Sequence, residues 1–524
     1  MLSNEVRDHL WGRLVPFWEG LRDRENGGFY GWMDSGLTVD READKGCILN
    51  SRILWFFSNA AICLAGEEGE RAALSGGAAL PGAGGQPARQ GEQAQSPQRE
   101  QDRAEVLKEC ADWAYRFLRD RCVDAERGGV YWSLDYRGRP EDTTKHTYNQ
   151  AFAVYALSSY YRAYRDREAL ELAERLIGVI EGRCFDAQGY KEALDIDFCP
   201  IANDKLSENG VMADRTMNTL LHVLEAYTEY LAACREAEQV SGVLSRTAGE
   251  GRSLAEGRKR REAGTLEDAE HGEERSLAED RKRREVGALE DAEYGEEQVR
   301  ERCQAKPTDA AAMGAAKGAG CGRSLEPGSP GAWRRTVEEK LCWILNLVAE
   351  RVYNPERRRQ EVFFDLHMES LIDLHSYGHD IEAAWLIDRC LEVLGDEGLT
   401  RRMSPILRSL EAEVYEKAYA RHSLANECER GVVDEKRVWW VQAEGVVGFY
   451  NAYQKTGERR YLEAAEDIWG FVRAHLVDER PEGEWFWYTD IEGNPALEKP
   501  IVEPWKCPYH NGRMCMEIVR RSAG

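Results

Sequence analysis

A turn-plus-aromatic phrase returns along this chain between segments that have helical periodicity. It reads Glu-Asn-Gly-Gly-Phe-Tyr at residues 25–30, Arg-Gly-Gly-Val-Tyr-Trp at 127–132 and, more loosely, Glu-Gly-Glu-Trp-Phe-Trp at 482–487. A phrase that recurs between helix pairs predicts a repeated helical-hairpin architecture, in which each hairpin buries its apolar face against the next. Alternating strand patterns are almost absent, so the sequence predicts an all-α fold.

Two stretches interrupt the helical pattern. Residues 66–104 are rich in Gly, Ala, Gln, Pro and Glu, and residues 234–331 contain a near-exact tandem repeat, 252–274 followed by 275–297. Both stretches are poor in the large apolar residues that would offset the entropy of ordering, so we expect two flexible insertions. The rest is long enough for one large domain, and the chain 1–524 is predicted to be a single domain with these two interruptions.

The charge and the aromatic content of the chain indicate which classes of ligand it can bind. The chain has 94 acidic and 70 basic residues and a net charge of −24. Such a surface repels nucleic acid and anionic lipid, so we expect neither as a partner. No stretch approaches the length of a membrane span. Most of the 15 Trp and 22 Tyr are expected in the core, and a few are expected to form stacking platforms for sugar rings.

Cysteine usage and the first residues indicate the compartment. The 14 cysteines show no Cys-x-x-Cys spacing, as is typical of reduced, buried thiols. The opening Met-Leu-Ser-Asn-Glu lacks the basic start and apolar run of a signal peptide. The sequence therefore predicts a reducing, cytoplasmic location.

Polar residues suited to catalysis stand at or near the predicted start of several helices. They are Arg52, Tyr148 with Asn149, Asn218 with His222, His379 with Glu382, Trp440 with Glu444, and Trp505 with His510. In a barrel of helical hairpins the inner helices can point these ends at one cavity. Three histidines, carboxylates, an arginine and aromatic plates would then line it.

His379 follows Gly378 in the first turn of its predicted helix. The positive end of the helix dipole favours a neutral imidazole there, and Glu382, one turn further on, is expected to orient the ring. His222 and Glu225 stand three apart on one helix face in the same way. A lone histidine at a helix start more often caps a core helix than takes part in catalysis. The catalytic interpretation of His379 therefore depends on the presence of the other histidines.

This set of groups suits one reaction class best. Two neutral imidazoles facing one carbon can remove and return a proton, and an arginine can stabilise the enediolate formed between the two steps. Proton exchange next to a sugar aldehyde needs no metal and no cofactor, and we expect neither. A glycosidase would need two carboxylates across a cleft, which Glu382 and Glu444 could supply. A zinc site is disfavoured because the three histidines lack any compact ligand spacing.

Six phrases together resemble the N-acylglucosamine 2-epimerase superfamily, most closely its cellobiose 2-epimerases. They are Asn-Ser-Arg-Ile-Leu-Trp at 50–55, His-Thr-Tyr-Asn-Gln-Ala-Phe at 146–152, Met-Asn-Thr at 217–219 with Leu-His-Val-Leu-Glu-Ala-Tyr-Thr at 221–228, Ser-Tyr-Gly-His-Asp-Ile-Glu-Ala at 376–383, Trp-Trp-Val-Gln-Ala-Glu at 439–444, and Pro-Trp-Lys-Cys-Pro-Tyr-His-Asn-Gly-Arg at 504–513. The resemblance spans the chain from Leu10 onward, outside the two insertions.

The resemblance implies an (α/α)6 barrel that works on a small-molecule disaccharide as a monomer or weak dimer. It implies reversible epimerisation at C2 of the reducing-end sugar of a β-1,4-linked disaccharide, through ring opening and a cis-enediolate. Alternatives that stay open are a monosaccharide epimerase or isomerase of the same superfamily, a glycoside hydrolase, and a carbohydrate-binding protein without activity.

The resemblance also implies roles for particular residues. His379 and His510 look like the acid/base pair, His222 like a third essential histidine, Arg52 like the enediolate stabiliser and Glu382 like the support of His379. The sugar-binding groups are expected to be Tyr148, Asn218, Trp440, Glu444 and Trp505, and Trp385 is also predicted to bind substrate. Leu220 departs from the family, which usually has histidine there.

Overall fold

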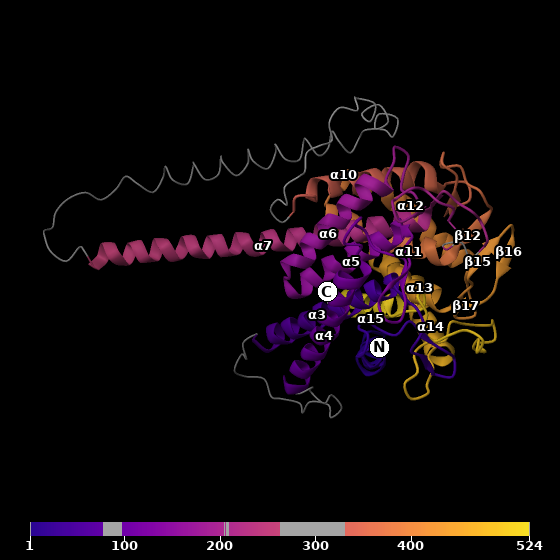
Figure 1. Ribbon diagram of the computed structural model, residues 1–524, viewed down its shortest axis with the longest axis horizontal. Coiled ribbons are helices and arrows are strands. Elements are labelled where there is room, and N and C mark those ends of the chain that lie inside the picture. Colours follow the sequence, from indigo (N-terminus) through magenta and orange to yellow (C-terminus); the bar gives the residue numbers. More distant parts are fainter. Residues whose placement is uncertain (1, 77–96, 204, 206–208, 263–330, 523–524) are drawn as a thin grey trace.

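The computed structural model describes residues 2–76, 97–203, 205, 209–262 and 331–522. Its body is a closed barrel of helices (Figure 1). Six inner helices pack in a ring in chain order, with the last against the first, in this described part of the chain. The inner helices are α3 (Cys47–Gly76), α5 (Thr147–Tyr164), α7 (Met217–Glu262), α11 (Tyr377–Leu394), α13 (Trp439–Thr456) and α15 (Tyr509–Ser522).

An outer layer of helices surrounds this ring, each packed mainly against one inner helix. Most outer helices contain or end in a π-helical turn (η). The outer elements are α1 (Leu2–His9), η1 (Leu10–Leu14) and α2 (Val15–Gly20); α4 (Pro97–Phe117) and η2 (Leu118–Cys122); α6 (Arg167–Val179) and η3 (Ile180–Cys184); α10 (Arg334–Leu347) and η4 (Val348–Val352); α12 (Glu397–Lys417); and α14 (Arg459–Phe471) and η5 (Val472–Leu476). The predicted all-α class and the (α/α)6 barrel are therefore confirmed.

Short antiparallel strands lie at the end of the barrel where the inner helices begin, some within one helical hairpin and others between neighbouring hairpins. The paired sets are β1 (Trp32–Met33) with β2 (Val39–Asp40); β3 (Lys45–Gly46) with β4 (Ser133–Leu134) and β5 (Pro140–Asp142); β6 (Lys145–His146) with β7 (Ala193–Leu194); β8 (Arg215–Thr216) with β11 (Phe363–Phe364); β9 (Tyr353–Asn354) with β10 (Arg359–Gln360); β12 (Leu374–Ser376) with β15 (Glu427–Glu429) and β16 (Val432–Asp434); β13 (Tyr419–Ala420) with β14 (Ser423–Leu424); and β17 (Arg437–Val438) with β18 (Tyr488–Thr489).

These strands close the ring as the helices do. The strand that precedes an inner helix pairs with the next hairpin, for example Lys145 with Leu194 and Val438 with Tyr488. A bridge between Met33 and Val502 links the last hairpin to the first. Backbone hydrogen bonds thus hold all the inner-helix starts in one circle, which is the condition for their side chains to meet.

The recurring phrase seen in the sequence is the turn between an outer and an inner helix. In its first copy Gly28 has a φ of +67°, which only glycine adopts without strain. The buried Lys45 bonds Asp23 and the carbonyl of Gly27 across this turn. Lys145 repeats the arrangement with Asp124 and Gly128 in the second copy.

A buried polar residue in the first turn of several inner helices binds the backbone of the preceding turn. The side chains of Asn50, Gln150 and Gln442 accept from the N–H groups of Phe29, Val130 and Leu424 at 3.1, 2.6 and 2.8 Å. Since a buried backbone N–H is costly to leave unpaired, these contacts fix the height of each inner helix in the barrel.

The prediction that no stretch approaches the length of a membrane span is wrong for helix α3. Residues Cys47–Glu67 are long and apolar enough to cross a bilayer, but 78% of the apolar window is buried in the protein. The helix is therefore an inner helix of the barrel. The cysteines of the described residues are all free thiols, most of them buried, as the cysteine pattern predicted.

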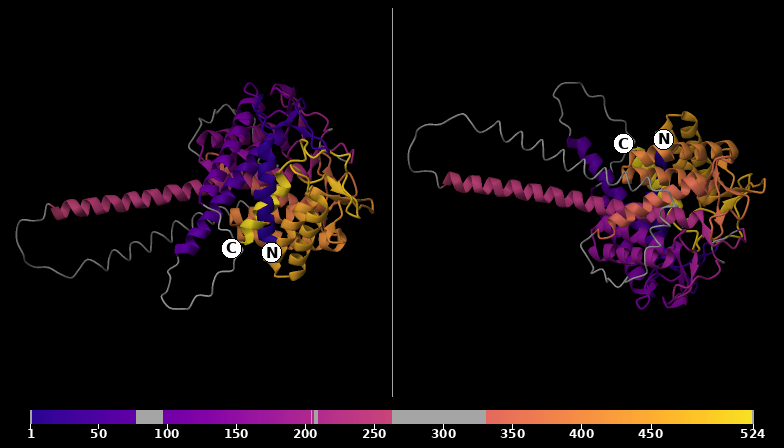
Figure 2. Two further views of the ribbon diagram at one scale, coloured as in Figure 1. Left: turned by 90° about the horizontal axis from the view of Figure 1, so that it is seen from below. Right: turned by 90° about the horizontal axis from the view of Figure 1, so that it is seen from above.

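Helices of the structure extend into both predicted insertions. Helix α3 continues to Gly76 and α4 begins at Pro97, so both helices extend into the 66–104 stretch. Helix α7 continues to Glu262, far beyond residue 234, and projects from the barrel (Figure 2). Glu, Arg and Ala are good helix formers, which explains why the helical pattern persists without an apolar face. Residues 77–96 and 263–330 lie outside the described part.

Deleting residues 240–325 is expected to leave activity measurable. Among the residues whose side chains are described, Cys234 and the half-buried Ala237 are the last of α7 that pack against the hydrophobic core. The site described below lies at the opposite end of α7. Kinetic assay of the deleted variant checks this expectation, and complete loss of activity in a soluble, folded protein would contradict it.

Candidate active site

A pocket opens where the inner helices begin. It encloses about 920 Å³ including the solvent at its mouth. Most of the predicted site residues line it, and they come from all six inner helices or the loops before them. Those residues are Arg52, Tyr148, Asn218, His222, His379, Glu382, Trp440, Trp505 and His510.

Two predicted residues lie behind the pocket wall. Glu444 and Trp385 are almost fully buried, and the Trp385 indole donates to Glu444 Oε2 at 3.0 Å. Trp385 also packs under the guanidinium of Arg513, 4.9 Å from its ring centroid. The structure therefore places Trp385 as a support of Glu444, away from the pocket.

The expected partnership of Glu382 with His379 is wrong. His379 Nδ1 instead pairs with Ser376 Oγ at 2.7 Å. Glu382 Oε1 accepts from Arg513, and its Oε2 is buried with no hydrogen-bond partner among the described residues. The reason is the rotation of α11 in the barrel. The side chain of Glu382 points across the barrel floor toward α15 and not along its own helix toward His379.

His379 and His510 share one aromatic neighbour. Their ring centroids lie 4.7 and 5.4 Å from that of Trp440. Trp440 reaches this position because Gly378 has no side chain: a Cβ there would come within 2.5 Å of the indole. The glycine before His379 thus serves the close approach of Trp440.

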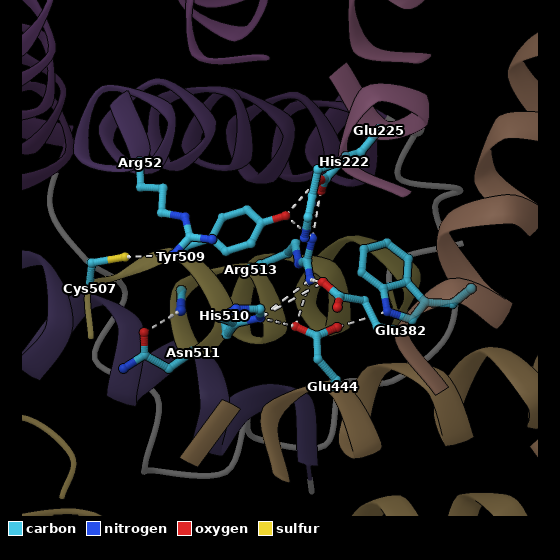
Figure 3. A network of polar contacts seen from close by, with 12 residues as sticks. Arg52, His222, Glu225, Glu382, Glu444, Cys507, Tyr509, His510, Asn511 and Arg513 are labelled. Atoms are coloured by element: carbon cyan, nitrogen blue, oxygen red, sulfur yellow. Dashed lines mark hydrogen bonds and ion pairs between the residues drawn. The ribbon is translucent and has the colours of Figure 1, made fainter. Parts of the chain in front are cut away.

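Arg513 is the centre of a buried polar network (Figure 3). Its guanidinium contacts three carboxylates, those of Glu225, Glu382 and Glu444. Glu225 Oε2 pairs with His222 Nδ1 at 2.8 Å, and Glu444 Oε1 pairs with His510 Nδ1 at 2.7 Å. The His222–Glu225 pair on one helix face is therefore confirmed.

Burial governs the protonation of the three histidines. It lowers the pKa of His379 to about 3, with His222 adding to the effect. The pKa values of His510 and His222 are also lowered, mainly by burial and, for His510, next by Arg513. These lowered pKa values are consistent with the predicted neutral imidazoles. Loss of solvation is the largest cause of each shift, so the helix dipole is not needed to explain them.

The pKa values of Glu225 and Glu382 are shifted in opposite directions. Burial opposes ionisation of Glu225, yet Arg513 and His222 bring its pKa down to about 2. Burial and the neighbouring Glu444 raise the pKa of Glu382, so that Glu382 is the group that retains a proton. The unpartnered Oε2 of Glu382 is consistent with a neutral carboxyl, because a buried carboxylate requires more donors.

Arg52 is held rigidly at the pocket wall. It donates to the Tyr148 hydroxyl at 2.8 Å, and its guanidinium stacks 4.2 Å from the Phe152 ring centroid and 4.7 Å from that of Tyr509. These contacts hold the positive charge of Arg52 in a fixed position at the cavity wall.

A cluster of possible metal ligands lies beside the pocket. Atoms of Glu382, Glu444 and His510 fall within 4.8 Å of one another. The Arg513 guanidinium bonds both carboxylates and so takes the place that a cation would have between them.

Sequence reasoning missed several members of the site. Arg513 and Tyr509 were not predicted as site residues. The spacing of Arg513, three residues after His510 on the same helix face, was the sequence signal that could have indicated its place beside His510. The half-buried residues of the outer pocket gave no signal, because they lie in loops or, for Glu427, at the start of the short strand β15. They are Lys205, Asn209, Asn426, Glu427 and Trp487.

Comparison with known proteins agrees with this site. The family model described as N-acylglucosamine 2-epimerase matches residues 94–227 and 333–511. A cellobiose 2-epimerase of Eubacterium cellulosolvens is 38% identical over 520 residues, which cover 99% of this chain and 98% of that protein.

Solved structures show the same similarity. A sugar epimerase from a ruminal bacterium is 35% identical with a TM-score of 0.71 over 99% of both chains. The cellobiose 2-epimerase of Bacillus thermoamylovorans B4167 is 33% identical with a TM-score of 0.70, again over 99% of both. The chain therefore belongs to the N-acylglucosamine 2-epimerase family and is a carbohydrate epimerase, an isomerase.

Proposed function

We propose that this chain reversibly epimerises C2 of the reducing-end sugar of a β-1,4-linked disaccharide. The observation that carries the proposal is the meeting of His379 and His510 on one indole, that of Trp440, in a pocket that also holds Arg52. Two imidazoles beside one binding position are what removal and return of a proton on opposite faces of a carbon require.

The proposed reaction begins with the open-chain sugar. The ring nitrogen of one histidine takes the C2 proton, and the electron pair left on C2 moves into the bond to C1, which gives a cis-enediolate. Arg52 stabilises the charge that develops on oxygen. The other histidine, in its protonated form, returns a proton to the opposite face of C2, and the roles are exchanged in the reverse reaction.

The delivered proton needs a source, because burial keeps the imidazoles neutral. Since Nδ1 of His510 is engaged with Glu444 Oε1, the proton that His510 delivers is carried on Nε2 and reaches that atom from the pocket, which the ring lines.

A second sugar has room beyond the histidines. The pocket continues past the buried imidazoles to half-buried side chains that offer aromatic faces and hydrogen-bonding groups, namely Trp505, Trp487, Asn426, Asn209 and Lys205. Aromatic platforms with a few polar groups are the usual equipment of a sugar subsite. This favours a disaccharide over a monosaccharide, in accord with the relatives named cellobiose 2-epimerase.

Proton NMR of cellobiose with the protein in heavy water tests the proposal. Epimerisation predicts new signals of a mannose-type reducing end, with deuterium at C2. Free glucose would instead indicate a glycoside hydrolase, and an unchanged spectrum would contradict any disaccharide activity. Parallel reactions with lactose, β-1,4-mannobiose, mannose and N-acetylglucosamine rank the substrates by kcat/KM, and preference for either monosaccharide would overturn the disaccharide assignment.

A further inference from the structure

Arg513 is buried on α15, one turn after His510, with 1% of its surface exposed. It contacts carboxylates from three other inner helices: Glu225 on α7, Glu382 on α11 and Glu444 on α13. Its planar fork offers several donors in a fixed geometry, which a lysine ammonium cannot reproduce. One side chain thus ties four inner helices together at the floor of the pocket.

The two ends of this guanidinium lead to two different histidines. On one side, Arg513 NH1 donates to Glu225 Oε1 at 2.6 Å, and the other oxygen of Glu225 lies 2.8 Å from His222 Nδ1. On the other side, Arg513 NH2 donates to Glu444 Oε1 at 2.7 Å, and the same oxygen lies 2.7 Å from His510 Nδ1. The tyrosine hydroxyl of Tyr509 also bonds Glu225 Oε2, at 2.5 Å.

Each of these carboxylates can only accept when it is ionised. Glu444 receives donors from Arg513, His510 and Trp385, and Glu225 from Arg513, His222 and Tyr509. The Nδ1 atoms of both histidines must therefore carry the hydrogen. Nε2 is then the ring nitrogen left to exchange protons in the pocket, which both rings line.

We propose that Arg513 is a positioning residue that sets the ring tautomer of His222 and His510 together, by fixing the two carboxylates to which their Nδ1 atoms donate. The inference rests on the proposed function, since it assigns Nε2 to the proton transfer. A single buried cation thereby gives two imidazoles on different helices the same tautomer.

Kinetics of Arg513→Lys and Arg513→Met separate geometry from charge. Arg513→Lys keeps the cation and loses the fork, so kcat should fall by roughly 100-fold, as when a catalytic imidazole loses its orienting group, with KM little changed. The acidic limb of kcat/KM should stay in place. Arg513→Met also removes the charge that lowers the pKa of His510, so its acidic limb should move to higher pH.

The tautomers can be read without any turnover. Long-range proton–nitrogen NMR of the histidine-labelled wild type, assigned with His222→Gln and His510→Gln, should show both rings protonated at Nδ1. In Arg513→Lys, which preserves the buried positive charge, both signals should become tautomer mixtures. This arm remains informative even where cellobiose is not epimerised, so failure of the inference and failure of the proposed function are distinguishable.

Arg162→Lys is the matched control. Arg162 also bonds two carboxylates, those of Glu229 and Glu236, but it lies in the last turn of α5, away from the pocket. It should leave kcat and both tautomers unchanged. Retention of wild-type kcat by Arg513→Lys, or Nδ1 protonation of both rings in that variant, would overturn the inference, as would Nε2 protonation of either ring in the wild type.

Discussion

Replacement of His510 by alanine, and separately of His379 by alanine, is expected to abolish epimerisation while the barrel stays folded. Each imidazole performs one of the two proton transfers, and loss of a general acid or base lowers a rate by roughly 100- to 10,000-fold. The barrel should stay folded, because Glu444 keeps its hydrogen bonds from Arg513 and Trp385 when the imidazole of His510 is removed.

A two-base reaction predicts more than loss of rate. In each variant the surviving histidine should still remove the C2 proton from one of the two epimers, so one epimer should take up deuterium without being converted into the other. NMR of both epimers in heavy water with each variant measures this directly. Loss of exchange from both epimers in one variant would assign both proton transfers to a single histidine.

The control for these variants is His422→Ala. His422 is an exposed imidazole that pairs with Asp467 on the surface, at 2.7 Å. It should epimerise at the wild-type rate. A near-wild-type rate in His510→Ala or His379→Ala would remove the acid/base pair from the proposed mechanism.

Replacement of Arg52 by methionine is expected to lower kcat/KM by roughly 100- to 1,000-fold, the usual cost of removing one preorganised stabiliser of a developing oxyanion. Arg52 is 2% exposed and lies within a cage of Tyr148, Phe152 and Tyr509, so it needs no reorganisation when charge develops. Arg52→Lys should recover only part of the rate, because an ammonium has neither the reach nor the planar stacking of a guanidinium.

Arg103→Met offers a comparison with the same kind of contact elsewhere. Arg103 lies on the outer helix α4, and its guanidinium stacks 4.7 Å from the ring centroid of Trp11. Its replacement should leave kcat unaltered. Steady-state kinetics of the three variants on cellobiose checks these expectations. If Arg52→Met lost only affinity, with kcat preserved, Arg52 would be a substrate-binding residue and the enediolate would need another stabiliser.

Several members of the site could be predicted from sequence because they sit in local signals. His379, His222 and Tyr148 each follow the start of an inner helix, and a barrel points such positions at one cavity. Their types, imidazole and phenol, also suggest the chemistry before any contact is known. Trp440 was predictable for the same reason, since it is the second residue of α13.

Pairings between helices were less accessible. Glu382 stands three residues after His379, so helical spacing favoured a contact between them, yet Glu382 bonds Arg513 and His379 bonds Ser376. Trp385 was expected to face the sugar and instead supports Glu444. Each error arises because spacing along one helix gives the face on which a residue lies, while the rotation of that helix in the barrel decides what the face meets.

The amino-acid sequence by itself determined the helical-hairpin architecture, since the turn phrase and the apolar spacing are properties of consecutive residues. It also determined which residue types are available at the inner-helix starts. Only the tertiary structure decided how the charges are shared, because Arg513 meets Glu225, Glu382 and Glu444 across distances of 288, 131 and 69 residues along the chain. Ring closure brings these groups together, and burial then makes one cation the common partner of three acids.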